Sequence, residues 1–382
     1  MTIVFTGGGS GGHFYPIIAI AEAIRKQVAD QRLVAPKLYY IAPSIFDEQA
    51  LFSEEIIFIK SPAGKLRRYP SLWNMTDLFV TASGVIWSLF MLFKLYPDVV
   101  VSKGGYASVP TVLAAHILRI PIVVHESDAK PGRANLLASK YATSIAVAFE
   151  SAASYFPKEA QSKVARTGIP VRKELFQVAA EGASQELGLE PGIPTVFILG
   201  GSLGSKRINE TVLSALPSLL DFANVIHQTG PKHIKEVEAT AKVILEKDAH
   251  KARYHALGYL SVLSLRRAAG AATLVVARAG STTITEISLW KKPAILIPIP
   301  ETISHDQKTN AYAYARTGAA VVIEEQNLTP HILASEARRI ATDPVLASAM
   351  AEKGASFADP DAAKLLAEEV LRIALSHEEK PA

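Results

Sequence analysis

Residues 2–16 read T-I-V-F-T-G-G-G-S-G-G-H-F-Y-P, a short apolar run followed by five glycines and a histidine. The apolar, β-branched run predicts a buried strand, and the glycines predict a strand-to-helix turn. Such a turn exposes backbone N–H groups at a helix N-terminus, where the helix dipole favours an anion such as a diphosphate. The glycines therefore predict a phosphate-binding loop, with a tight structural turn as the alternative.

The same alternation of short apolar runs and helix-like stretches continues along the chain, which is typical of βαβ units around a parallel sheet. The two halves look like similar folds in tandem, and we expect two Rossmann-like α/β domains with parallel sheets facing across a cleft. The predicted strands are 2–5, 37–42, 98–102, 121–125 and 144–149 in the first half, and 194–200, 223–228, 253–257, 273–278, 293–298 and 319–324 in the second.

Glycine and proline breakers separate the two sets of strands, and they place the domain boundary near Gly168–Arg172. We predict a first domain over residues 1–168 and a second over 169–355. Residues 356–382 are expected to form a C-terminal helix that packs back on the first domain.

The composition excludes several classes of site. The 382 residues contain no cysteine, so disulfides and thiolate metal sites are absent from the sequence. The net charge of +4 suits an acidic membrane or phosphorylated ligands, and no nucleic-acid-binding module is recognisable. No H-E-x-x-H motif occurs, so we expect no bound metal. The first residues already predict a strand, and we expect no secretory signal.

One apolar segment stands out in the first half. Residues 78–93 carry no charge, although they are fewer than the roughly 20 apolar residues of a spanning helix. The preceding stretch holds four basic residues and no acid, which suits attachment to an anionic lipid surface. The alternative is a buried core helix behind a solvated basic loop. The four basic residues are Lys60, Lys65, Arg67 and Arg68.

Three more glycine-containing turns follow predicted strands, at residues 102–110, 198–209 and 277–286. Open α/β sheets bind ligands at the carboxyl ends of their strands, so four such turns in two domains predict more than one diphosphate site. His13 begins the helix after the first turn, where the positive end of the dipole favours a neutral imidazole that can accept a proton. A helix-capping or packing role is the alternative for His13.

A polar loop follows another predicted strand. His125, Glu126, Asp128 and Asn135 come together in H-E-S-D-A-K-P-G-R-A-N, residues 125–135. These side chains suit the hydroxyls of a sugar, and an ordinary capped loop is the alternative.

Taken in order, these motifs resemble the MurG family of GT-B glycosyltransferases. The resemblance covers most of the chain and implies an inverting, metal-independent transfer of N-acetylglucosamine from UDP-N-acetylglucosamine to lipid I, without a cofactor. It also implies a peripheral enzyme on the cytoplasmic face of the cell membrane. The motifs that carry it lie at residues 8–16, 104–110, 125–135, 167–172, 200–205, 277–286, 306–311 and 318–325.

The resemblance assigns roles by position. The catalytic base is His13, with Glu126 as the second candidate. In the donor site Glu286 holds the ribose, Gln307 the sugar and the backbone of Leu260 the uracil, while Asn310 matches a motif position. The full donor site is Ser10, Gly11, Gly12, Asp128, Arg172, Ser202, Leu260, Arg278, Ser281, Thr282, Thr283, Glu286 and Gln307, and the acceptor site is Gly8, Gly9, Tyr106 and Asn135.

Five positions depart from the family pattern. Asp128 and Ile169 each stand where the family has asparagine, and Ser127 where it has glutamine. Leu203 replaces a glutamine, and Asp306 a histidine or glutamine. An aspartate in place of asparagine removes a hydrogen-bond donor and adds a charge, so it bears on the identity of the donor sugar.

Three other functions stay open. Another GT-B lipid glycosyltransferase, such as one that makes glucosyl diacylglycerol, would share the fold and the membrane habit. A non-catalytic protein that binds UDP-sugars at the membrane is the second, and a nucleotide-sugar epimerase of related fold is the third.

Overall fold

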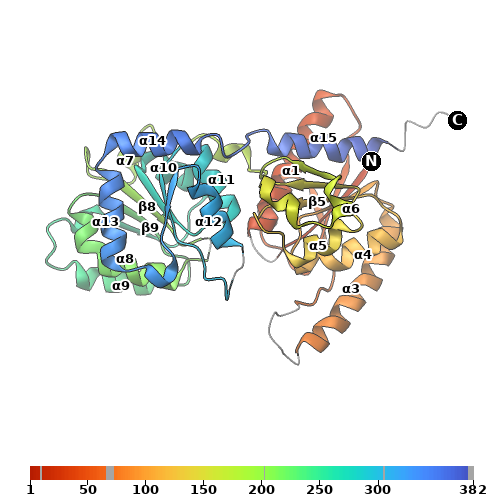
Figure 1. The fold of residues 1–382 in the computed structure, drawn as a ribbon, viewed down its shortest axis with the longest axis horizontal. Coiled ribbons are helices and arrows are strands. Elements are labelled where there is room, and N and C mark those ends of the chain that lie inside the picture. The colour runs from red at the N-terminus through yellow and green to blue at the C-terminus, as the bar shows by residue number, and fades with distance from the viewer. Residues whose placement is uncertain (9–10, 66–72, 202, 304–305, 377–382) are drawn as a thin grey trace. The chain divides into compact units, whose positions relative to one another are not determined.

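The computed structural model describes residues 1–8, 11–65, 73–201, 203–303 and 306–376. It divides into two compact units, one made of Met1–Arg172 with Asp359–Ala382 and the other of Lys173–Ala358 (Figure 1). Each unit is a parallel sheet covered by helices. The predicted α/β class with two Rossmann-like sheets is confirmed.

Within its described residues the first unit has seven parallel strands, in the order β3-β2-β1-β4-β5-β6-β7. The central strands are buried along their length because helices cover both faces of the sheet. The strands are β1 (Thr2–Thr6), β2 (Lys37–Ala42), β3 (Ile56–Lys60), β4 (Val99–Ser102), β5 (Ile122–Glu126), β6 (Ser144–Val147) and β7 (Val164–Arg166).

The helices of the first unit form two apolar cores, one on each face of the sheet. Ile3 and Phe5 point to the core that contains α1 and α15, while Val4 points to the core beneath α4. Gln27 Nε2 on α1 donates a hydrogen bond of 2.9 Å to the carbonyl of Lys364 on α15. The helices are α1 (Gly11–Asp30), α2 (Glu48–Ser53), α3 (Trp73–Leu95), α4 (Val109–Ile117), α5 (Arg133–Ser139), α6 (Lys158–Gln161) and α15 (Ala362–Leu375).

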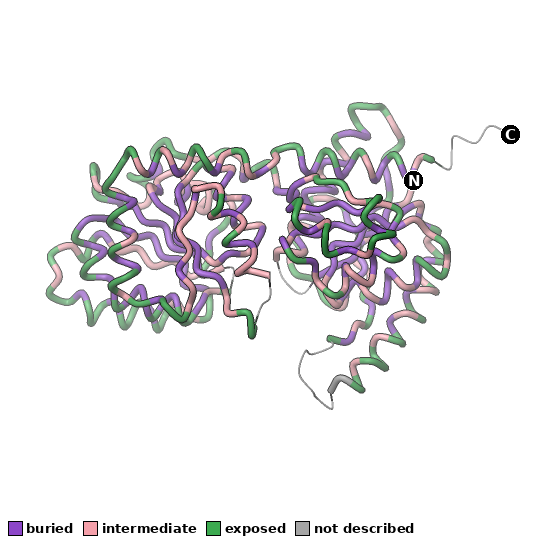
Figure 2. Tube along the Cα trace, viewed as in Figure 1, coloured by how far each residue is buried: buried purple, intermediate pink, exposed green. Residues whose placement is uncertain are grey.

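The second unit repeats this plan with six parallel strands among its described residues, in the order β10-β9-β8-β11-β12-β13. The strands are β8 (Thr195–Leu199), β9 (Asn224–Gln228), β10 (Tyr254–Leu257), β11 (Leu274–Ala277), β12 (Ala294–Leu296) and β13 (Ala320–Val322). The helices are α7 (Ala183–Glu186), α8 (Lys206–Leu220), α9 (Ile234–Ile244), α10 (Val262–Ala271), α11 (Ser281–Leu289), α12 (Gln307–Ala315), α13 (Pro330–Ala341) and α14 (Pro344–Gly354). In both units the central strands are buried and the outer faces of the helices are exposed (Figure 2).

In each sheet the strand order reverses at one point, between β1 and β4 in the first unit and between β8 and β11 in the second. Loops that leave neighbouring strands in opposite directions at such a point open a crevice at the carboxyl ends of the strands, where α/β sheets bind ligands. The four glycine-containing turns of the sequence follow these four strands.

Candidate active site

The two glycine turns of the first unit pack against each other. Gly105 follows β4 with φ of +75°, and a Cβ placed there would lie 2.6 Å from the carbonyl oxygen of Gly8, which follows β1. Tyr40 Oη donates a hydrogen bond of 2.6 Å to the carbonyl of Gly7 and anchors the first turn. The absence of side chains is therefore a packing requirement here, because the two backbones touch. Two predicted site residues of this turn, Gly9 and Ser10, lie outside the described residues.

His13 is the third residue of α1, after the predicted donor-site residues Gly11 and Gly12, and its side chain is half-buried. Burial lowers the pKa of His13 to about 4, and the charge of Lys103 adds to this effect while the Asp128 carboxylate opposes it. The imidazole is therefore neutral at pH 7, and burial rather than the helix dipole is the main cause. A neutral ring can accept a proton from an attacking hydroxyl.

Glu126 ends β5 and is buried among donors from its own loop. Its Oε1 accepts a hydrogen bond of 2.9 Å from the backbone N–H of Asp128, and its Oε2 accepts from Gly132 N at 3.1 Å and Asn135 Nδ2 at 2.9 Å. Burial is the main cause that raises the pKa of Glu126 to about 7, with the Asp128 carboxylate next. The two oxygens thus hold the loop over residues 126–135 in place, which is a structural role beside the predicted catalytic one.

The rest of this loop surrounds Glu126. Asn135 is buried and also donates to the carbonyl of His125 at 3.2 Å, and His125 Nε2 meets the carbonyl of Gly168 at 2.9 Å. Among the described residues, Asn135 Oδ1 is a buried acceptor without a hydrogen-bond partner. Tyr106 is half-buried and begins a 3₁₀ helix over Tyr106–Ser108, beside the second glycine turn.

Lys103 is a member of this cluster that the sequence did not reveal. It follows β4 directly, its side chain is 1% exposed, and its Nζ donates a hydrogen bond to Ser127 Oγ. Burial lowers the pKa of Lys103 to about 8, although the carboxylates of Glu126 and Asp128 favour its charged form. A lysine in front of a glycine turn resembles an exposed loop residue, so only its position at the end of a buried strand could have pointed to it.

Arg172 was predicted to meet the donor diphosphate. In the structure it belongs to the first unit, where its guanidinium carbon lies 4.3 Å from the ring centroid of Tyr15 on α1. Its Nε is buried and has no hydrogen-bond partner among the described residues. Ile169, which stands in place of the family asparagine, is buried in the same segment.

In the second unit, α11 presents an uncapped N-terminus after β11. Gly280 is the N-cap residue and gives no side-chain hydrogen bond to the first turn. Thr282 Oγ1 is buried without a hydrogen-bond partner in the described part of the chain, and Ser281 is also buried beside it. Thr283 and Glu286 are half-buried on the same helix. Backbone N–H groups and hydroxyls gathered at a helix N-terminus suit a diphosphate.

Gln307 begins α12 and braces this turn from the side. Its Oε1 accepts hydrogen bonds from Ala279 N at 3.2 Å and from Ile299 N at 3.1 Å. The amide oxygen therefore fixes the loops after β11 and β12. Asn310, one turn further along α12, is fully buried.

Arg278 directly follows β11 and links three segments of the second unit. Its Nη2 donates to Ser205 Oγ at 2.7 Å and to Glu325 Oε2 at 2.5 Å, and its Nη1 donates to the carbonyl of Ile297 at 3.2 Å. These bonds fix the loops around the third glycine turn, so the structure gives Arg278 a bracing role beside the predicted contact with the donor.

The third glycine turn follows β8. Gly204 has φ of +78°, and a Cβ there would lie 1.9 Å from the carbonyl oxygen of Thr229, whereas Gly201 opens to free space. Leu203 is exposed, and Ser202 lies outside the described residues. Leu260, the predicted uracil-binding position, is buried after β10. Among the described residues, the predicted donor-site residues of the second unit thus follow β10, β11 and β12.

Helix α3 presents an apolar surface to solvent. Leu78, Phe79, Ile86, Phe90 and Phe93 are all at least 60% exposed, while Leu92 packs inward. The stretch Met75–Leu95 is long and apolar enough to cross a membrane by length and composition, and 17% of its most apolar window is buried. The buried-helix alternative therefore does not fit. Of the basic residues that precede it, Lys60 and Lys65 are exposed, and Arg67 and Arg68 lie outside the described residues.

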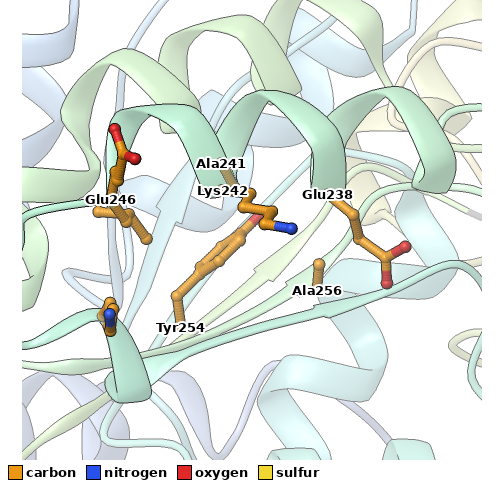
Figure 3. Close-up of a pocket in the computed structure, with 8 residues that line it drawn as sticks. Glu238, Ala241, Lys242, Glu246, Tyr254 and Ala256 are labelled. Carbon is orange, nitrogen blue, oxygen red and sulfur yellow. The ribbon is translucent and has the colours of Figure 1, made fainter.

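A cavity of about 400 Å³ opens beside edge strand β10, where the ring of Tyr254 lies against α9 (Figure 3). The residues that line the cavity belong to α9, to the segment between α9 and β10, and to β10 itself. The cavity lies away from the carboxyl ends of the strands. None of the predicted site residues that the structure describes lines this cavity. Its lining residues are Glu238, Ala241, Lys242, Leu245, Glu246, Lys251, Tyr254 and Ala256. In the described part of the chain, no group of three His, Asp or Glu residues could hold a metal ion.

Comparisons with known proteins agree with this arrangement. The glycosyltransferase family 28 N-terminal domain matches residues 3–147, and the C-terminal domain of that family matches residues 195–366. Proteins called UDP-N-acetylglucosamine–N-acetylmuramyl-(pentapeptide) pyrophosphoryl-undecaprenol N-acetylglucosamine transferase are similar in sequence. That of Treponema denticola is 35% identical, over 86% of this chain and 85% of its own length. A second from Bacillus cereus is 38% identical, over 86% and 88%.

A solved structure is similar in fold. The crystal structure of Acinetobacter baumannii MurG aligns with a TM-score of 0.72 at 24% identity, and the alignment covers 97% of this chain and 99% of that one. The likeness extends over both units.

Proposed function

This chain belongs to glycosyltransferase family 28, and from that premise we propose that it transfers N-acetylglucosamine from UDP-N-acetylglucosamine to lipid I. The acceptor group is the C4 hydroxyl of the N-acetylmuramyl sugar, and the product is lipid II in peptidoglycan synthesis. The observation that supports this choice of donor and acceptor is the similarity to two transferases whose names state both substrates. They match 86% of the chain at 35% and 38% identity.

The transfer is a single displacement. The acceptor hydroxyl attacks C1 of the donor sugar, the bond from C1 to the diphosphate oxygen breaks with its electrons, and the anomeric carbon is inverted. His13 takes the proton of the hydroxyl, for which its neutral ring is suited. UDP leaves with added negative charge, which the N–H groups of α11 and the Thr282 hydroxyl stabilise. The contact of Arg172 with the diphosphate stays a prediction.

Glu286 and Gln307 select the donor in this proposal. The carboxylate of Glu286, one turn into α11, accepts hydrogen bonds from the ribose hydroxyls. Gln307 keeps its amide N–H groups for the sugar, because its oxygen already accepts from the backbone of Ala279 and Ile299. Asp128 stands where the family has an asparagine, so its carboxylate bears on which sugar is accepted.

The enzyme works at a membrane surface. Helix α3 inserts its exposed apolar face into the lipid interface, and the basic residues before it, Lys60 and Lys65 among them, attract anionic headgroups. In this proposal the protein is a peripheral enzyme on the cytoplasmic side of the membrane, where UDP-N-acetylglucosamine and the diphosphate head of lipid I meet. We expect no nucleic-acid partner, because no nucleic-acid-binding module is recognisable in the sequence.

The deciding experiment measures UDP release with lipid I and a panel of UDP-sugars. Release with UDP-N-acetylglucosamine above all others supports the proposal, and loss of release in His13→Ala with an unchanged fold supports the role of that ring. Transfer to diacylglycerol, without inhibition by undecaprenyl phosphate analogues, would instead identify another lipid glycosyltransferase. Binding of UDP-sugars without release of UDP would indicate a non-catalytic protein.

A further inference from the structure

The first unit buries a lysine that the displacement does not use. Lys103 is 1% exposed at the carboxyl end of β4, next to the point where the strand order reverses. Burying an ammonium group is costly unless opposite charges and hydrogen bonds compensate for the lost water. The groups around the Lys103 ammonium therefore indicate the role of this side chain.

In the described part of the chain, the groups whose charges interact with Lys103 include four of the candidate active site. Glu126 and His125 approach from β5, Asp128 from the loop that follows β5, and His13 from α1. Glu126 and Asp128 bring carboxyl groups, and the two histidines are held neutral. Lys103 is thus the counter-charge of the carboxyl groups in this cluster.

The direct contact of Lys103 is with a residue that departs from the family pattern. Its Nζ donates to Ser127 Oγ, where the family has a longer glutamine, and its neighbour Asp128 stands in place of an asparagine. The short Ser127 side chain accepts a hydrogen bond from the Lys103 ammonium, and the Asp128 carboxylate balances the charge of that ammonium. The two departures and the buried lysine therefore form one arrangement.

We propose that Lys103 is a positioning residue for the transfer: buried at the end of β4 and hydrogen-bonded to Ser127, its ammonium balances the carboxyl groups at the end of β5 and so sets the charge around His13. The inference rests on the proposed function, since it assigns His13 as the base. Lys103 and Asp128 act on His13 with opposite sign, because the lysine disfavours an imidazolium and the carboxylate favours one.

The test compares Lys103→Met, Asp128→Asn and the double variant with Lys140→Met, which removes an exposed lysine of the same unit. The readout is kcat/KM for UDP release with lipid I, from pH 3.5 to 8.5, a range that includes the wild-type acid limb near the His13 pKa of about 4. In Lys103→Met we expect the acid limb to move to higher pH, with a loss of about threefold or more at pH 5.5 relative to pH 8. In the double variant, Asp128→Asn should return the acid limb to its wild-type pH. The control Lys140→Met should have the same acid limb as wild type.

An NMR titration of the His13 ring without substrate repeats the test independently of activity. If wild type releases no UDP with lipid I, the proposed function fails, and this titration still decides the role of Lys103. If Lys103→Met does not fold, the double variant and Asp128→Asn are compared, and the ring should titrate at lower pH in Asp128→Asn than in wild type. An unchanged His13 titration in these variants, or an acid limb that Asp128→Asn does not restore, would overturn the inference.

Discussion

Asn135 Nδ2 donates a hydrogen bond of 2.9 Å to Glu126 Oε2, the oxygen that also accepts from the backbone of Gly132. The other oxygen, Oε1, accepts from the backbone of Asp128. Glu126 is therefore committed to shaping its loop, whereas the half-buried ring of His13 is neutral at pH 7. This relationship separates the two candidate bases of the transfer.

The pH profile of wild-type kcat/KM distinguishes His13 from Glu126 as the base. The acid limb reports the pKa of the essential base in the free enzyme. With His13 as the base, activity persists down to pH 5 and falls near the pKa of about 4. With Glu126 as the base, the limb lies near its pKa of about 7. At pH 5 only about 1% of such a group is ionised, and activity falls with it.

Glu126→Gln provides the control for this profile. If the carboxylate only shapes the loop, this variant loses stability but keeps the acid limb near pH 4. A limb near pH 7 in wild type that disappears in Glu126→Gln would transfer the role of base from His13 to Glu126.

The contact between the two glycine turns predicts a sharp effect at Gly105. A Cβ there meets the carbonyl oxygen of Gly8 at 2.6 Å, so Gly105→Ala must displace one of the two turns. Gly182→Ala is the matched control, because Gly182 has a similar φ of +69° and nothing within 4 Å of its added Cβ. The control should lose only the roughly 1–2 kcal/mol of a left-handed alanine.

Gly105→Ala should lose about 1–3 kcal/mol more than that control in urea unfolding, because the steric conflict adds to the backbone strain. It should also lose most of its activity, since the first turn leads directly into the helix that carries His13. Equal losses of stability in the two variants would mean that the turns can separate without cost.

Much of the fold could be predicted because each buried strand stands between clear breakers. All six predicted strands of the second half are present, and so are the five of the first half. Strands β3 and β7 were missed. No glycine or proline separates β3 from the helix before it, and β7 is three residues long, two of them exposed.

The candidate site was predictable where backbone alone defines it, as in the glycine turns and the start of α1. It was not predictable where side chains distant in sequence meet. Lys103 is buried because a loop more than twenty residues further along the chain folds over it, and Ser127 accepts its hydrogen bond. The bracing bonds of Arg278 likewise span three loops. Such burial follows from tertiary packing, which a local pattern does not contain.

Gln307 allows its structural and its binding role to be tested separately. Gln307→Glu keeps an oxygen that can accept from Ala279 and Ile299 but removes the amide donor. We expect it to fold normally, to bind UDP like wild type, and to bind UDP-N-acetylglucosamine about tenfold or more weakly, because a hydrogen bond is worth roughly 0.5–1.5 kcal/mol and the added charge opposes the sugar. Calorimetry with both ligands measures this difference.

Gln307→Ala is the companion variant. It leaves two backbone N–H groups without their acceptor, so it should also lose about 1–3 kcal/mol of stability and bind both ligands more weakly. If Gln307→Glu binds UDP-N-acetylglucosamine as tightly as wild type, the amide does not read the sugar.

The exposed residues of α3 lie on one side of the helix. Phe79, Ile86, Phe90 and Phe93 are spaced by seven, four and three residues, which places them on the same face. An apolar face of this kind that is left open to solvent marks an interaction surface. If the surface is for lipid, its affinity should depend on the apolar area that the face can bury.

Phe79→Ser with Phe93→Ser should therefore weaken sedimentation with phosphatidylglycerol vesicles by about tenfold or more, because burying one such side chain is worth roughly 1.5–3 kcal/mol. Val345→Ser is the control, since Val345 is 80% exposed on α14 in the second unit, and its binding should stay at the wild-type level. With a water-soluble, short-chain acceptor the double variant should keep its turnover, because the change leaves the strand ends intact. Unchanged binding to vesicles would remove α3 as the membrane contact, and equal loss with both acceptors would indicate a damaged fold rather than a lost lipid surface.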